Sequence, residues 1–121
     1  MESAEIVRIL SKVHENFDPD LHLRESIGWI KRAQDFGTDR GVSWGTKFGQ
    51  GFQPSYPETT GHIICAFLDL ARIFSTAEYL ERAIDMGLWE VAVQMRNGAV
   101  MAGPVNGNPT PAAFNTGQVL L

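Results

Sequence analysis

The sequence contains an internal repeat of a helix start, which narrows the folds that this chain can adopt. Residues 59–64 read TTGHII and residues 115–120 read NTGQVL, and the two hexapeptides match in residue type at every position. The helical segments that precede them also align at two apolar positions each, Leu23 with Leu80 and Ile27 with Ile84. A helix pair that recurs after fewer than about 60 residues forms a unit that can bury its inner helix only against a neighbouring unit. We therefore expect two copies of an outer helix, a long loop and an inner helix.

Hydrophobic periodicity predicts where the helices lie. An amphipathic helix is expected over residues 4–13, outer helices over 21–37 and 76–95, an inner helix over 58–74, and a second inner helix from about residue 110. The inner helix is apolar around most of its circumference, whereas each outer helix has one apolar face. On the second outer helix that face carries Leu80, Ala83, Ile84, Gly87, Leu88, Val91 and Met95. The strand signals, GVSWG and NGAVMAG, are weak. The expected fold class is all-α, with short extended pieces in the loops.

The length of 121 residues predicts one domain, 1–121. Within it we expect an N-terminal covering helix over 1–16, a first repeat over 21–74 and a second over 75–121. The second repeat stops after barely three turns of its inner helix, on an apolar VLL. We therefore expect an incomplete array, that is, a homo-oligomer or a part of a longer chain.

Charge and composition exclude several classes of partner. The net charge of −4 and the pI near 5.2 argue against nucleic acid, whose binding depends on Lys and Arg. No apolar run reaches the about 18 residues of a membrane span, so no membrane is expected. The single cysteine, Cys65, and an N-terminus unlike a secretory signal predict a cytoplasmic protein.

Four motifs, GWIKRAQD, GVSWG, PSYPETTGHI and FNTGQVL, resemble the (α/α) toroids of the six-hairpin glycosidase-like superfamily, in a bacterial branch whose members often have no assigned activity. The resemblance covers roughly residues 21–121. Related toroids include glycoside hydrolases, polysaccharide lyases and sugar epimerases. The resemblance implies part of such a toroid, acting on a saccharide in the cavity where inner-helix N-termini point. Since these toroids normally have about six hairpins and two are visible, fold transfers better than activity.

Glu58 has two interpretations. Ser55 and Glu58 have the spacing of a capping box, with Pro57 in the first turn, and capping is the favoured interpretation. However, the aligned residue of the second copy is Phe114, so the helical unit does not require a carboxylate there. Glu58 is therefore also the candidate catalytic residue. Asp39, in a turn, is a poor second carboxylate.

The other candidate residues are ligand-binding ones: Trp44, Tyr56, His62 and Asn115. Aromatic side chains stack on sugar rings, although most large aromatics are buried. His62 belongs to a polar row on the inner helix that includes Cys65 and Asp69, but this spacing matches no established zinc motif. In a purely structural interpretation, Cys65 packs as a small hydrophobic residue and Asp69 pairs with Arg72. We expect no metal and no cofactor.

Three functions are weighed. The first is a carbohydrate-active toroid that uses Glu58 in acid–base chemistry. The alternative is a noncatalytic helical-repeat module that self-associates to complete its core. A terpenoid-type toroid is disfavoured, because the sequence has no Asp-rich diphosphate motif.

Overall fold

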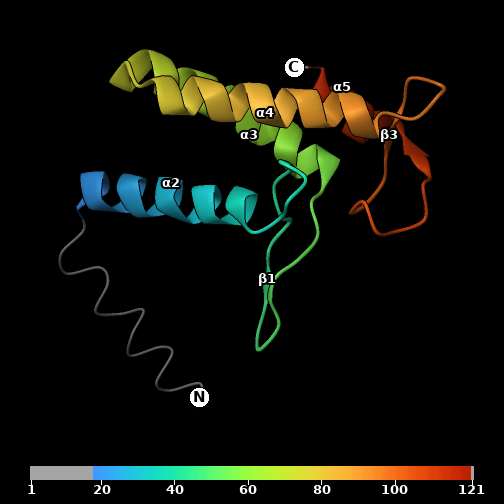
Figure 1. The fold of residues 1–121 in the computed structure, drawn as a ribbon, viewed down its shortest axis with the longest axis horizontal. Helices are drawn as coiled ribbons and strands as arrows, with labels where there is room; N and C mark the ends of the chain where they lie inside the picture. The colour runs from blue at the N-terminus through green and yellow to red at the C-terminus, as the bar shows by residue number, and fades with distance from the viewer. Residues whose placement is uncertain (1–17, 121) are drawn as a thin grey trace.

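The computed structural model describes residues 18–120, and this part of the chain is mainly α-helical, as the sequence predicts (Figure 1). Its helices are α2 (Pro19–Asp35), α3 (Pro57–Phe74), α4 (Ala77–Val93) and α5 (Ala113–Val119). Its strands are β1 (Thr46–Lys47), β2 (Gly51–Phe52), β3 (Val100–Met101) and β4 (Pro111–Ala112). The helix expected over 4–13, within the covering segment 1–16, lies outside the described residues.

The helices α3 and α4 form a tight antiparallel hairpin, and α2 runs beside it (Figure 1). The turn between α3 and α4 is sharp because Ser75 adopts a left-handed conformation with φ of 50°. Tyr79 of α4 packs edge-on against Phe67 of α3, with ring centroids 5.7 Å apart. Phe67 belongs to the buried core, which draws on α2, the first loop, α3 and α4: Ala33, Val42, Phe67, Ala83 and Met86.

The start of α2 has a local cause that the sequence analysis overlooked. The carboxylate of Asp18 accepts hydrogen bonds from the backbone N–H groups of Asp20 at 3.0 Å and Leu21 at 3.2 Å. Asp18 is thus a side-chain N-cap, and Pro19 occupies the first turn, where no N–H is required. The helix begins two residues before the predicted boundary.

The two long loops carry the strands. In the first loop β1 pairs antiparallel with β2, and an isolated bridge joins Ser43 to Ser55. Phe52 of β2 anchors this loop, because its ring lies 5.4 Å from that of Trp29 and 5.7 Å from that of Phe36. In the second loop β3 pairs antiparallel with β4. The NGAVMAG signal therefore contains β3, whereas GVSWG ends just before β1 and holds only the isolated bridge of Ser43.

The packing of α4 differs from the prediction. The buried residues of α4 are Ala83, Met86, Trp89 and Glu90. Four of the apolar residues expected on its packed face, here called the α4 row, are instead 46% to 71% exposed: Leu80, Ile84, Leu88 and Val91. The reason is that α3 covers the face of Ala83 and Met86, whereas no element of residues 18–120 covers the α4 row.

The second inner helix also starts later than predicted. Pro111 and Ala112 pair with β3, and α5 begins at Ala113. Thr110, expected to cap the helix, instead accepts a backbone hydrogen bond from the N–H of Ala102 at 2.7 Å. The strand pair therefore delays the helix by about one turn.

Candidate functional site

Two threonines fix the starts of the inner helices. Thr60 Oγ1 donates to the carbonyl of Tyr56 and accepts from the N–H of Val42, both at 2.9 Å. Thr116 Oγ1 does the same in α5, because it donates to the carbonyl of Ala112 at 2.7 Å and accepts from the N–H of Val100 at 2.9 Å. Each threonine thereby ties the preceding loop to the first turn of an inner helix.

Three of the candidate site residues meet where these two helices begin. The hydroxyl of Tyr56 donates to Glu58 Oε2 at 2.8 Å and accepts from Asn115 Nδ2 at 3.2 Å. Asn115 Nδ2 also donates to the carbonyl of Met101 at 3.1 Å, and Asn115 is buried. These bonds join Tyr56, Glu58 and Asn115 into a polar cluster between the start of α3 and α5. Tyr56 and Glu58 are half-buried, so the cluster is partly open to solvent.

The favoured capping interpretation of Glu58 is wrong in its geometry. The N-cap of α3 is Tyr56, not Ser55, and no described side chain caps the helix by a hydrogen bond. Ser55 cannot act as the cap because it is held in extended backbone opposite Ser43, and its hydroxyl donates to Asp39 Oδ1 at 2.9 Å. The Glu58 carboxylate is therefore oriented by Tyr56. Its charge still suits the positive end of the helix.

Trp44 and His62, the other two ligand candidates, lie outside the hydrogen-bonded cluster. Trp44 is exposed in the first loop, and the amine of Lys47 stands 5.8 Å from its ring centre. His62 is exposed on α3, one turn after Glu58, so both lie on one side of the helix. The structure therefore joins Tyr56, Glu58 and Asn115, but not Trp44 or His62, by hydrogen bonds.

The remaining sequence interpretations have mixed outcomes. Asp39 is structural, because its Oδ1 accepts from the N–H of Gly41 at 3.1 Å and from Ser55. Asp69 pairs with Arg72 at 3.4 Å, as predicted. Cys65 is exposed, so its prediction as a packed hydrophobe is wrong. Within residues 18–120 no three His, Cys, Asp or Glu side chains are arranged to hold a metal ion.

Glu90 is a buried titratable residue that the sequence analysis missed. It is only 4% exposed, and neither carboxylate oxygen has a hydrogen-bond partner in the described part of the chain. Burial raises the pKa of Glu90 to about 8, so the carboxyl is mostly protonated at neutral pH. A buried neutral carboxyl can act as a proton donor. The available signal was its spacing of four and seven residues from Met86 and Ala83, which puts Glu90 on their buried face.

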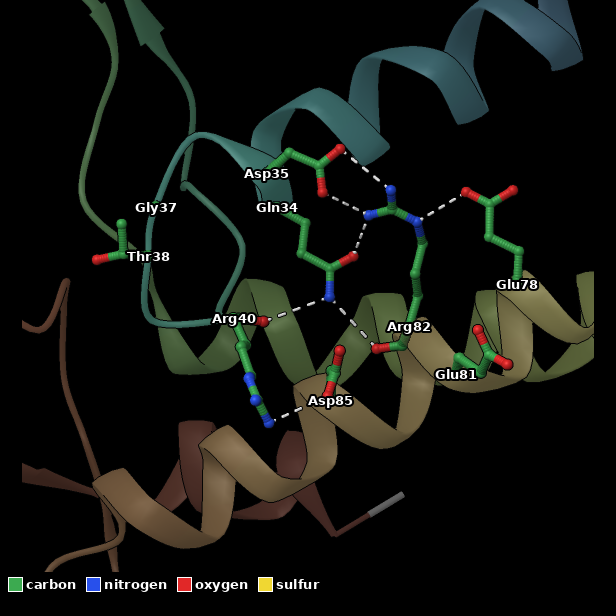
Figure 2. A pocket seen from close by; sticks show the side chains of 9 residues that line it. All are labelled: Gln34, Asp35, Gly37, Thr38, Arg40, Glu78, Glu81, Arg82 and Asp85. Carbon is green, nitrogen blue, oxygen red and sulfur yellow. Dashed lines mark hydrogen bonds and ion pairs between the residues drawn. The ribbon is translucent and has the colours of Figure 1, made fainter.

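A charged pocket of about 390 Å³ lies between α2 and α4 (Figure 2). At its centre Arg82 donates to both carboxylate oxygens of Asp35, at 2.8 and 3.0 Å, to Glu78 at 3.0 Å and to Gln34 Oε1 at 2.8 Å. Arg40, from the loop after α2, pairs with Asp85 of α4 at 3.2 Å in the same pocket (Figure 2).

Most charges of this pocket are paired with one another, whereas Glu81, which also lines it, makes none of these ion pairs. The hydrogen bond from Arg82 lowers the pKa of Asp35, and hydrogen bonds from Lys31 and then Arg82 lower the pKa of Glu78. The same contacts raise the pKa of Arg82. We therefore infer that the ion pairs and hydrogen bonds of this pocket hold α2 against α4, and we do not assign a reaction to it.

Among residues 18–120 there is no helix with the length and apolar character to cross a bilayer. Comparison of the chain with the models of known protein families, with curated proteins and with solved structures gives no match.

Proposed function

We propose that this chain is part of a carbohydrate-active (α/α) toroid in which Glu58 performs acid–base chemistry on a saccharide. The observation that carries the proposal is the cluster of Tyr56, Glu58 and Asn115. Glu58 is not used as a helix cap, and it receives a hydrogen bond from a side chain that a second helix also contacts. A carboxylate positioned by a neighbour that is itself fixed has the arrangement of a general acid or base.

The chemistry follows from the donor order. Because the Tyr56 hydroxyl donates to Glu58 Oε2, the carboxylate is held in one orientation, as a general base must be. Asn115 donates to the same hydroxyl oxygen, so the phenolic proton is directed towards Glu58. A carboxylate held in this way can take a proton from an attacking water, as in inverting glycoside hydrolysis. In sugar epimerisation or elimination the same base would instead take the proton from a ring carbon.

The site also has surfaces that suit a sugar. Trp44 exposes an apolar ring in the first loop, and stacking on such a ring is a common mode of saccharide binding. His62 is exposed one turn beyond Glu58 and can donate or accept a hydrogen bond. We assign Trp44 and His62 to substrate contact and Glu58 to the reaction.

The test is a panel of neutral and uronate-containing oligosaccharides, with new reducing ends and unsaturated uronate absorbance as readouts. Glu58→Gln should lower turnover at least about 100-fold, because general acid–base catalysis contributes about this much or more. Glu81→Gln, an exposed change of the same kind on α4, is the control and should keep full turnover. Turnover in Glu58→Gln equal to that of the parent would refute the role of Glu58.

The second candidate is a noncatalytic repeat module that associates through an apolar surface. The α4 row favours it, because four large apolar side chains in line are exposed on one helix. The absence of turnover on every oligosaccharide, together with a discrete assembly in solution, would select this alternative.

A further inference from the structure

The repeat shows how one outer–inner helix pair covers the previous one. On the inner layer, α5 lies against Gly61 of α3: a methyl group at Gly61 would stand 3.0 Å from the Cα of Val119 and 3.2 Å from the carbonyl of Gln118. The close approach depends on the missing side chain of Gly61. In the aligned motifs Gly117 of α5 corresponds to Gly61.

The corresponding surface of α5 is open. A methyl group at Gly117 would meet nothing within 4 Å among the described residues. Within residues 18–120, the position that receives α5 on the first inner helix is therefore uncovered on the second.

The outer layer repeats this relationship. On α2 the side chains of Lys31 and Gln34 contact α4, through Glu78 and Arg82 respectively. When Leu23 is aligned with Leu80, Lys31 corresponds to Leu88 and Gln34 corresponds to Val91. These two are members of the exposed α4 row. The surface of α4 that corresponds to the covered surface of α2 is thus also open. In the first repeat, α4 covers this surface of α2 and α5 covers Gly61 of α3; the matching surfaces of α4 and α5 have no such cover within residues 18–120.

We propose that a second copy of this chain docks here, head to tail, with its α2 over the α4 row and its α3 against Gly117. The same alignment identifies the contact residues of the arriving copy, because Glu78 and Val119 correspond to Leu21 and Ile63. Leu21 is 53% exposed on α2. The internal pair of Lys31 with Glu78 therefore becomes a pair of two leucines between copies, Leu88 and Leu21.

This leucine pair is the reason to assign a copy of the chain as the occupant. Within the chain, the two outer helices meet through charged side chains that are 18% to 60% exposed. At the open side the corresponding positions are apolar on both partners, and burying two exposed leucines is favourable. In the second internal pair, Gln34 corresponds to Val91 of one copy and Arg82 to Glu25 of the arriving copy. The methylene groups of the Glu25 side chain can cover Val91.

The contact is heterologous, so every added copy presents the same open side again. Such contacts close into a ring or continue as a filament. The inference does not rest on the proposed saccharide chemistry, because Leu21, Leu88 and Gly117 belong to none of its steps.

The first experiment measures the mass of the chain by light scattering across a dilution series. The parent should give multiples of its 13.4 kDa at high concentration and dissociate on dilution. Leu88→Glu and Gly117→Leu should each weaken association at least tenfold while keeping the helical circular dichroism. Phe48→Glu is the matched control, because Phe48 is 99% exposed at a hairpin tip, and it should associate as the parent does.

The second experiment identifies which surfaces meet. In a Cys65→Ser background, chains with Leu21→Cys alone and Leu88→Cys alone are treated with a short bis-maleimide, separately and mixed. The mixture should cross-link, and neither chain should cross-link efficiently alone, because residues 21 and 88 face each other only between different copies.

Three outcomes would overturn the proposal. A 13.4 kDa monomer at every concentration, with dye bound to the α4 row, would assign that row to another partner or to a further repeat of a longer chain. Cross-linking of Leu88→Cys with itself would show a two-fold contact between α4 helices. Unchanged association in both Leu88→Glu and Gly117→Leu would place the interface elsewhere.

Discussion

Tyr56 donates a hydrogen bond of 2.8 Å to Glu58, two residues further along the chain. The same hydroxyl accepts from Asn115, so a single phenol connects the starts of α3 and α5. Because Ser55 is engaged with Asp39, Glu58 is available for a role other than capping.

The first prediction separates this network from a helix cap. Tyr56→Phe should lower the free energy of unfolding by about 1 to 2 kcal/mol, because it removes two hydrogen bonds at a half-buried position. Glu58→Gln should change it by less than about 0.5 kcal/mol, since the amide oxygen still accepts from Tyr56. Urea unfolding monitored by circular dichroism measures both. A cost for Glu58→Gln as large as that of a lost cap, about 1 kcal/mol or more, would contradict the assignment.

The second prediction concerns the two threonines at the starts of the inner helices. Thr60→Val should cost about 2 to 3 kcal/mol, because Thr60 is fully buried and the N–H of Val42 loses its acceptor. Thr116→Val should cost about 1 kcal/mol, because Thr116 is half-buried and water can reach the site more easily. Valine has nearly the same shape, so the difference reports the hydrogen bonds. Equal costs for the two changes would argue against this dependence on burial.

The third prediction contrasts two glycines in aligned positions. Gly61→Ala should destabilise the chain by about 1 to 3 kcal/mol, since the new methyl group meets the backbone of Val119. Gly117→Ala should be neutral or stabilising by up to about 1 kcal/mol, because nothing in the described chain opposes the methyl group and alanine favours helix. Thermal unfolding at low protein concentration, where copies are apart, makes the comparison. A loss for Gly117→Ala as large as that for Gly61→Ala would show that Gly117 is already covered.

Much of the secondary structure could be predicted from the sequence because it depends on local patterns. The inner helix is bounded by Pro57 and by the left-handed Ser75, and its predicted start and end agree with the structure to within one residue. The start of α5 was missed because it depends on a tertiary pairing, that of β4 with β3. Likewise, periodicity identifies an apolar face of α4 but does not say whether a neighbour covers it.

The candidate site could be predicted only in part. The sequence names Tyr56 as an aromatic that can stack on a sugar, Glu58 as a carboxylate that the repeat does not require, and Asn115 within the motif FNTGQVL. The bonds between them could not be derived, since they depend on how closely α5 approaches α3 at Gly61. Glu90 was overlooked because a glutamate in a helix is normally exposed, and its spacing from Ala83 and Met86 indicates burial only once their face is known to be the packed one.

The last prediction is a pH dependence that comes from Glu90. Its pKa is about 8 in the folded chain and near 4.5 when exposed, so between these values the folded state holds a proton that the unfolded state has released. Stability should therefore fall as pH rises, by at most about 1.4 kcal/mol per unit from this group, and the loss should end above pH 8. Asp35 and Glu78, whose pKa values are lowered, act in the opposite direction, but only below about pH 4.5.

Glu90→Gln isolates this contribution, because the amide is similar in size and does not titrate. Urea unfolding at pH 5, 6, 7 and 8, values chosen to span the window set by the pKa of about 8, should show a flatter profile for this variant than for the parent. Its advantage over the parent should grow towards pH 8. Glu81→Gln, an exposed change on the same helix, should keep the parent slope. Parallel profiles for Glu90→Gln and the parent would mean that Glu90 does not hold its proton in the folded chain, and its assignment as a neutral buried carboxyl would be wrong.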